Sequence, residues 1–482
     1  DGYRTQIFEM HDRPGGLCTS WQRKNYTING CIHLLLGCRP GSDFYRIWEE
    51  LGAIQGRQIV NYEEFIRFEG TNGRTFILYG NIDQLEEHMM EIASEDHKLV
   101  REFIKGARMC TRFKMPPILK ARELYGPIDG LELLFKILPH MGLLRKWFKI
   151  SMRDFAARFK NPLLREAFSS MWFPEVPVLF TLMTISLLHK KTAGYPAGGS
   201  LEFSRAIERR YLDLGGQFQY SSRVSKIVVE NNHAVAIRLE DGSEHRADFV
   251  ISAADGYSTI FNMLDGKYAN KKIRGYYQKL PIFPPLIYIA LGINRSFEPI
   301  PGSTTGLNFP LEETVSIAGK ELNRLGIRVH NFDPTLAPSG KTLAKVMIPS
   351  NFAYWKPLGE DINRYQAEKE QISDRVVAVL DKRFPGLSNL VEMLDVATPI
   401  TYYRYTGNWQ GSHQGWLVTP QTWKFRMKKN LPGLDNFYMA GQWVEPGGGV
   451  PSAAMSGRNV IQILCKRDKK PFVTTIGQAA NY

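Results

Sequence analysis

The stretch Asn436–Gly457, NFYMAGQWVEPGGGVPSAAMSG, decides the fold because it encodes a strand, a glycine loop and a helix in immediate succession. Asn436–Ala440 predicts a short strand and Gly441–Gly449 a loop. Pro451 suits a first helical position, which predicts a helix over Pro451–Lys466. Such a unit offers free backbone amides and the positive end of a helix dipole to an electron-rich ligand. The stretch therefore predicts a cradle for a cofactor, with an ordinary loop before a helix as the alternative.

A second strand and glycine turn lie at the start of the chain. Tyr3–Met10 predicts a strand that ends near Glu9, and the turn-forming stretch Asp12–Gly16 follows. In a dinucleotide-binding fold, an acid at the end of the second strand binds ribose hydroxyls, and the glycine-rich phosphate turn lies about 20 residues upstream of it. We therefore expect this chain to be a fragment without the first βα unit. A solvated carboxylate beside a plain turn is the alternative.

The chain between these two ends changes character at Gly194–Gly199. Before it, Ile82–Leu188 has a mostly helical pattern with several proline breaks, which predicts a helical insertion. After it come a helix ended by two glycines and several β-branched runs, of which the first three are separated by the hairpin signals Asn231-Asn232 and Asp241-Gly242. The expected elements are helices over Ser200–Leu214 and Arg364–Arg383, and strands over Val224–Glu230, Ala234–Leu239, Ala247–Ile251, Lys279–Asn294 and Lys341–Ser350.

Composition narrows the class of protein. The chain has 482 residues, of which 43% are hydrophobic, so it can bury a sizeable core. Its net charge of +13 suits an anionic membrane, nucleic acid or an acidic ligand. No nucleic-acid-binding motif appears, so we expect no nucleic-acid partner. The five cysteines lack CxxC spacing, which predicts neither a disulfide framework nor a metal site and favours a reducing cytoplasm. The longest apolar stretch, Val176–Leu188, is too short to span a bilayer.

Five segments, taken in order, resemble one known family. They resemble the FAD-dependent phytoene desaturases, carotenoid isomerases and retinol saturases, within the wider amine oxidase group. The resemblance spans nearly the whole chain and is more specific than any single motif. The segments are IFEMHDRPGGLCTSW (Ile7–Trp21), INGCIHLLLG (Ile28–Gly37), YPAGGSLEFSRAIERRYLDLGGQFQYSSRVSKIVVE (Tyr195–Glu230), ADFVISAADG (Ala247–Gly256) and FYMAGQWVEPGGGVPSAAMSG (Phe437–Gly457).

The resemblance implies a non-covalent FAD and a set of residues that bind it. Glu9 is implied as the ribose ligand, and Val224 as the residue whose backbone meets adenine. The turn beside the phosphates and ribityl chain is implied to comprise Arg13, Gly15 and Gly16. Ribityl and isoalloxazine are implied to contact Gly441, Gln442, Gly448, Gly449 and Val450. Many relatives carry an acid where Gln442 stands, although an amide also bonds a hydroxyl.

The fold implied is α/β, with a Rossmann-like FAD-binding lobe and an inserted substrate lobe of helices and mixed sheet. We expect the FAD-binding lobe to comprise residues 1–80, 195–262 and 431–482, and the substrate lobe residues 81–194 and 263–430. The function implied is FAD-dependent desaturation, saturation or isomerisation of a hydrophobic polyene or lipid-like substrate. A flavin amine oxidase is the first alternative. The second is a non-enzymatic lipid or prenyl carrier, since Rab GDP-dissociation inhibitors share a similar architecture.

The sequence identifies neither a catalytic residue nor the oligomeric state. Hydride transfer to a flavin needs positioning and a dry site more than a protein base. The candidates for proton handling are His33, His189, His330, Tyr402, Tyr403 and His413, although a lone histidine or tyrosine is more often a structural residue. Tyr402-Tyr403 with Trp409 and Trp416 predicts either an aromatic wall for a polyene or a core hairpin.

The stretch Leu131–Phe173 mixes basic and large apolar residues. That pattern predicts either a helix that lies on an anionic membrane or a helical cap over the substrate cavity. Peripheral membrane association of a cytoplasmic protein is therefore our expectation for its location.

Overall fold

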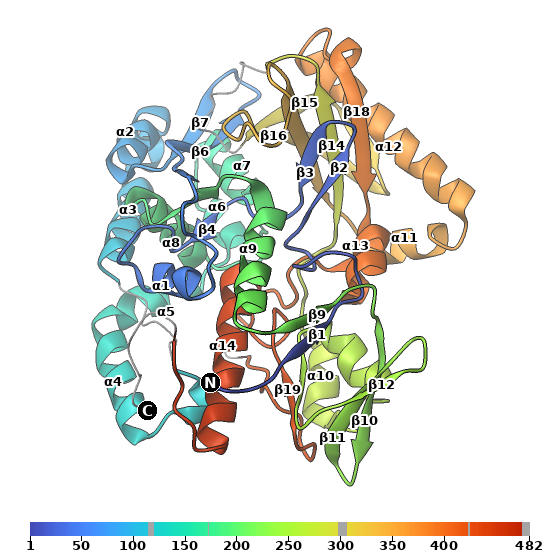
Figure 1. The fold of residues 1–482 in the computed structure, drawn as a ribbon. Helices are drawn as coiled ribbons and strands as arrows, with labels where there is room; N and C mark the ends of the chain where they lie inside the picture. The colour runs from blue at the N-terminus through green and yellow to red at the C-terminus, as the bar shows by residue number, and fades with distance from the viewer. Residues whose placement is uncertain (114–119, 172, 297–305, 423–424, 475–482) are drawn as a thin grey trace.

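The computed structural model describes residues 1–113, 120–171, 173–296, 306–422 and 425–474 (Figure 1). Its largest sheet has seven strands in the order β18-β14-β17-β16-β15-β6-β7. The bounds are β18 (Val391–Ala397), β14 (Leu286–Ile293), β17 (Thr342–Pro349), β16 (Lys320–Val329), β15 (Leu307–Ile317), β6 (Glu64–Glu69) and β7 (Thr75–Tyr79). All pairs are antiparallel except β15 with β6.

One face of this sheet packs on the long helix α12 (Ile362–Arg383) and the shorter α11 (Phe352–Leu358). Ile372, Val376 and Leu380 lie at helical spacing, and they bury one stripe of α12 against strand residues such as Ile327 and Val346. The expected helix Arg364–Arg383 and strand Lys341–Ser350 are thus confirmed. The opposite face points toward the middle of the molecule (Figure 1).

The expected helical insertion is also confirmed. It contains α2 (Ile82–Ile92), α3 (His97–Arg112), α4 (Pro127–Ile137), α5 (Met141–Phe148), α6 (Met152–Ala156), α7 (Pro162–Ser170) and α8 (Val178–His189). Local capping sets the ends: Asn81 accepts from the backbone N–H of Asp83 at 2.8 Å, and Asn161 caps α7 ahead of Pro162. The helices share an apolar core centred on Phe103, and α8 is buried on most of its surface.

The stretch Leu131–Phe173 divides into an exposed and a buried part, with Trp172 outside the described residues. No residue of α4 is buried, and Ile128, Leu131 and Phe135 are exposed by 81%, 54% and 64%. On α5, by contrast, Leu143 and Trp147 pack into the helical core. The amphipathic surface helix is therefore α4, together with the turn η3 (Leu138–His140).

Two short pairs of parallel strands lie near the middle of the molecule. β1 (Gln6–Phe8) pairs with β9 (Gln217–Gln219), and β13 (Val250–Ser252) pairs with β19 (Phe437–Met439). Within the described ranges, β1 and β13 each have this one strand partner. The helices α9 (Gly199–Asp213) and α14 (Gly449–Arg467) run beside them (Figure 1). The strand, loop and helix expected in Asn436–Gly457 are present, as is the helix expected over Ser200–Leu214.

Several strand expectations need correction. β10 (Val224–Glu230) and β11 (His233–Leu239) form the expected hairpin, but its third strand is β12 (Glu244–Arg246) rather than Ala247–Ile251. The latter range ends in β13, which pairs with β19 instead. Lys279–Asn294 starts inside α10 (Lys271–Lys279), and only its second half is the strand β14. The hairpin β15–β16 was not expected.

The smaller elements complete the chain. β2 (Ser20–Arg23) and β3 (Tyr26–Asn29) form a hairpin, and β8 (Ala193–Pro196) lies between β4 (Leu35–Leu36) and β5 (Ile59–Val60). The remaining helices are α1 (Asp43–Glu50) and α13 (Pro399–Thr406). Tyr402-Tyr403 lies in α13, so a core hairpin at this pair is wrong. The β6–β7 pair, which we expected in the FAD-binding lobe, joins the seven-stranded sheet through β15.

Candidate functional site

A single cavity of about 2520 Å³ connects the parallel pairs with the seven-stranded sheet. Residues of β1, β13 and α14 line one part of it, and residues of β14, β16 and β17 line the other. Eight of the ten residues expected to bind FAD border this cavity: Glu9, Gly15, Gly16, Val224, Gly441, Gln442, Gly449 and Val450. The fold thus brings together segments from both ends of the chain and from its middle.

The loop that precedes α14 depends on glycine. Gly448 has φ 57° and ψ −155°, a conformation that side chains strongly disfavour. A Cβ on Gly448 would lie 2.0 Å from the carbonyl oxygen of Gln414, so this glycine is required by the protein itself. Gly448 does not border the cavity, unlike Gly449 and Val450 at the helix N-terminus. The close backbone contact with Gln414, rather than contact with a flavin, therefore explains the glycine at position 448.

Gly441 and Gln442 are fixed by neighbouring side chains. The backbone N–H of Gly441 donates to Oγ of Ser456 at 2.7 Å, which connects the loop to α14. Nε2 of Gln442 donates to Oδ1 of Asn408 at 2.9 Å. Gln442 still borders the cavity, so its amide oxygen and its second N–H remain for a ligand. This amide can bond a hydroxyl, as the resemblance requires.

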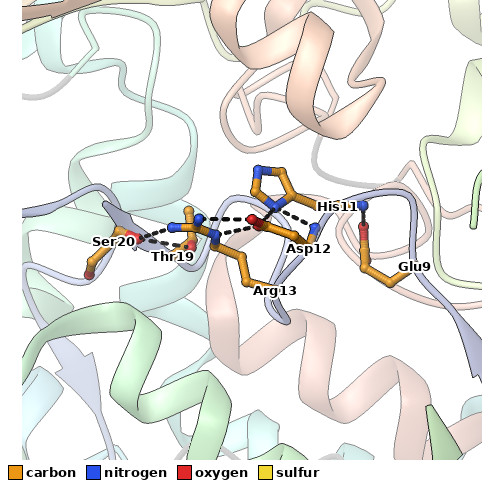
Figure 2. Close-up of polar contacts among 6 residues, drawn as sticks. All are labelled: Glu9, His11, Asp12, Arg13, Thr19 and Ser20. Carbon is orange, nitrogen blue, oxygen red and sulfur yellow. Dashed lines mark hydrogen bonds and ion pairs between the residues drawn. The ribbon is translucent and has the colours of Figure 1, made fainter. Parts of the chain in front are cut away.

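Glu9 directly follows β1 (Figure 2), and it borders the cavity. One carboxylate oxygen accepts the backbone N–H of His11 at 2.9 Å. Burial raises the pKa of Glu9, and backbone hydrogen bonds from His11 and Met10 oppose that shift. Because Glu9 borders the cavity, its carboxylate can accept hydroxyl donors from a bound sugar.

Arg13 has a structural role in the turn after β1. Its Nε donates to Asp12 at 2.7 Å, and a terminal nitrogen donates to the carbonyl of Ser20 at 3.3 Å (Figure 2). Arg13 does not border the cavity. In Gly15, a Cβ would lie 2.3 Å from the carbonyl oxygen of Cys18, whereas a Cβ on Gly16 would meet open space. Within this turn, Gly16 is therefore the residue at which the missing side chain leaves open space beside the cavity.

The shape and chemistry of these residues fit a flavin dinucleotide. The cavity is continuous from Val224 and Glu9 to the start of α14, which suits a long ligand with an adenosine end and a ring end. Gly16 and Gly449 allow backbone to approach such a ligand closely. The α14 N-terminus supplies a positive dipole end, which suits the negative charge that a reduced flavin ring gathers.

The candidates for proton handling separate into two groups. Nδ1 of His189 accepts the backbone N–H of Ile82 at 3.2 Å, and Tyr403 is 46% exposed and packs on Phe352, so both are structural. His33, His413 and Tyr402 border the cavity. Burial lowers the pKa of His413 to about 4 and that of His33 well below its ordinary value, so both are neutral at pH 7.

His330 lies behind the cavity wall with both ring nitrogens unpartnered. The tryptophans are packed against other aromatic side chains. Trp416 is 5.3 Å from Trp443 and 4.9 Å from Tyr277 between ring centroids, and Trp409 stacks on Tyr257 at 5.2 Å. Neither tryptophan borders the cavity, so an aromatic wall built by Trp409 and Trp416 is wrong.

Two basic residues at the site were not predicted from the sequence. Lys345 is fully buried, and its Nζ lies 3.2 Å from Nδ1 of His33 and 3.2 Å from the carbonyl oxygen of Asn29. Arg328 lies opposite Lys345 in the register of β16 and β17 and borders the cavity. The available signal was a charged residue inside each apolar run, LGIRVH and TLAKVMIP. No group of three or more metal-ligating side chains occurs among the described residues.

The family model for flavin-containing amine oxidoreductase matches residues 1–463. The chain belongs to this family. It is a flavin-dependent oxidoreductase, which agrees with the site described above.

Curated relatives match at similar coverage. Prolycopene isomerase of Arabidopsis thaliana is 26% identical over 474 residues, which cover 94% of this chain and 77% of the relative. The lycopene-forming phytoene desaturase of Pseudescherichia vulneris is 23% identical, with coverage of 96% and 94%.

Solved structures share the fold. An oxidoreductase from Methanosarcina mazei has a TM-score of 0.58 at 20% identity, covering 96% of this chain and 94% of that one. Putrescine oxidase bound to putrescine has a TM-score of 0.55 at 10% identity, covering 95% and 93%. At these identities the likeness concerns the fold alone.

Proposed function

We propose that the protein uses non-covalently bound FAD to desaturate, saturate or isomerise a polyene or similar lipid. The observation that carries this proposal is the single cavity that joins the residues expected to bind FAD to an apolar chamber. The chamber is lined by residues such as Phe68, Phe283, Leu286 and Met347. The names of the relatives, prolycopene isomerase and phytoene desaturase, support a polyene as the substrate. The loop Gly441–Gly449 contains no cysteine or histidine that could attach a flavin covalently.

The chain contributes positioning and exclusion of water in this proposal. Bound FAD supplies the acceptor or donor of hydride. The apolar lining holds a hydrocarbon chain beside the α14 N-terminus and keeps water away from it. The neutral His33 and His413 add no charge next to the chain. We assign no protein base.

The function is tested by anaerobic spectroscopy of the flavin-loaded protein against a panel of phytoene, prolycopene and putrescine. We expect a polyene to change the flavin absorbance, or to be converted when the flavin is reduced beforehand, as seen by chromatography. Putrescine should have no effect. Bleaching by putrescine alone would establish an amine oxidase, and a protein that never holds flavin would support the carrier alternative.

We further propose that another parallel strand completes the sheet between β1 and β13. Residues of both strands line the cavity, and each strand has one edge without a strand partner within the described ranges. Ile7 and Ile251 are 38% and 41% exposed at these edges. An unpaired edge next to apolar surface is unfavourable in a folded protein. A strand followed by a glycine turn would cover both edges and supply amide donors to the FAD pyrophosphate.

We also propose that α4 binds an anionic membrane peripherally. No helix among the described residues is long and apolar enough to cross a bilayer. α4 and the start of η3 instead expose five large apolar side chains in one short segment, and Arg145, Lys146 and Lys149 follow on or just after α5. Apolar side chains that enter the interface beside basic residues are typical of peripheral binding. The five are Ile128, Leu131, Leu134, Phe135 and Leu138, the last of them at the start of η3.

We expect the protein to float with phosphatidylserine vesicles at low salt, and the triple variant Ile128→Ser, Leu131→Ser, Phe135→Ser to remain at the bottom of the gradient. Changing Lys136, Arg145, Lys146 and Lys149 to Glu should also weaken flotation. Changing the exposed Leu212, Leu214 and Ile362 to Ser is the matched control, since Leu212 lies on α9, Leu214 directly follows it and Ile362 begins α12. Equal flotation of all variants would show that α4 is not the contact.

A further inference from the structure

The cavity-facing side of the seven-stranded sheet carries two cations close together. Arg328 on β16 is directly opposite Lys345 on β17, so the two side chains share one face of the sheet. Their neighbours in register, Ile327 with Val346 and Val329 with Ala344, lie on the other face in the core beneath α12. The alternation of the strands thus aims both cations away from that core and toward the cavity.

Neither cation has an acidic partner. Within the described residues, no carboxylate forms an ion pair with Arg328 or Lys345, and the guanidinium of Arg328 makes no side-chain hydrogen bond. The side chains that influence Arg328 electrostatically are the phenols of Tyr62 and Tyr288. Arg324, on the same face of β16, shows the contrast. It is 2.9 Å from the carboxylate of Glu166 and donates to Oδ1 of Asn308 at 2.6 Å.

The two side chains differ in whether they can lose their charge when no carboxylate is near. Burial and the charge of Arg328 lower the pKa of Lys345 well below its ordinary value, so the lysine can lose its proton and its charge. A guanidinium stays protonated in proteins. Arg328 therefore keeps a permanent charge at the wall of a largely apolar cavity. A charge held away from bulk water is costly unless a counter-charge joins it.

We propose that Arg328 binds the carboxylate of a substrate whose long apolar chain occupies the rest of the cavity. The planar fork of a guanidinium matches a carboxylate through two parallel hydrogen bonds. The same cavity wall supplies Phe68, Leu286, Tyr288 and Met347 to an apolar chain. This inference rests on the proposed function and narrows its substrate class from any polyene or lipid to a chain with an acidic end.

The test compares one polyene acid with its uncharged derivative. cis-Parinaric acid, a conjugated tetraene, fluoresces when it enters an apolar site, and its methyl ester keeps the chain but loses the charge. We expect the wild-type protein to bind the acid at least about tenfold more tightly than the ester. Arg328→Met should abolish this preference while leaving ester binding unchanged. Arg328→Lys should retain part of the preference, because the charge remains without the fork.

A matched control accounts for the net positive charge of the protein. Lys271→Met removes one exposed cation at the start of α10 and should leave the preference intact. Equal binding of acid and ester by the wild type would overturn the proposal, even if the Arg328 variants fail to fold. An unchanged preference in a folded Arg328→Met protein would also overturn it.

This result is separable from that of the proposed function. The binding assay needs no turnover, so Arg328-dependent acid binding without any flavin chemistry on polyenes would contradict the function alone. Turnover of neutral polyenes together with equal acid and ester binding would contradict only the assignment of Arg328.

Discussion

Gly16→Leu should lower the affinity for FAD by at least about tenfold while leaving the fold intact. Gly16 borders the cavity in the turn after β1, and a Cβ there would meet no protein atom within 4 Å. A leucine side chain would therefore enter space that FAD occupies in our proposal, rather than displace the protein. The measurement is flavin absorbance per protein after saturation with FAD and desalting.

Gly242→Leu is the matched control. Gly16 and Gly242 have φ of +57° and +87°, and in both a Cβ meets open space, but Gly242 lies in the hairpin turn between β11 and β12 and does not border the cavity. Both substitutions carry a similar backbone penalty of about 1 kcal/mol. Equal flavin contents in the two variants would mean that the turn after β1 does not touch the cofactor. Gly448→Val is less informative, because its side chain would strike the carbonyl of Gln414.

The second large effect concerns the proposed strand between β1 and β13. We expect the 482-residue chain to hold FAD about a hundredfold more weakly than a longer chain that carries this strand and its glycine turn ahead of Asp1. Hydrogen bonds to a charged group contribute about 1.5 to 3 kcal/mol each, and the loss of two or three from the pyrophosphate accounts for that ratio or more. Contacts at Val224 and Val450 are too few to compensate.

Both chains would be saturated with FAD, desalted and compared by flavin absorbance. The longer chain should also protect the backbone amides of β1 and β13 from hydrogen exchange, because a central strand would bond to both edges. Equal retention of flavin would mean that residues within this sequence hold the phosphates. Unchanged exchange at Ile7 and Ile251 would show that no strand enters between them.

Local patterns were sufficient for much of the fold. The glycine loop that leads into a helix and the helical spacing in Ile82–Leu188 each depend on residues close in sequence, and both predictions are confirmed. The helix begins at Gly449 rather than at Pro451, so Pro451 is its third residue. The order of five short segments was sufficient to predict the family correctly. The residues that line the cavity from Glu9 to Val450 followed from that resemblance, and their binding roles stay predictions.

Other features depend on register between distant strands, which the sequence does not display. β15 and β16 interrupt their apolar alternation with charged residues such as Glu312 and Lys320, so the hairpin lacked the usual pattern. Arg328 and Lys345 meet only because β16 pairs with β17 in one register. Gly448 is necessary because a side chain there would clash with the backbone carbonyl of Gln414, which is distant in the chain.

The parallel strand pairs also determine when each part of the protein can fold during its synthesis. Gln6 pairs with Gln217, and Val250 with Phe437, so each pair waits for about 200 further residues to emerge. At roughly 5 to 20 residues per second, the edge of β1 stays without β9 for roughly 10 to 40 seconds of synthesis. The helical stretch Ile82–Ser170, by contrast, can begin to fold as it emerges. The nascent chain therefore leaves β1 and β13 unpaired for much of its synthesis, and we expect these strands to need protection by a chaperone during translation.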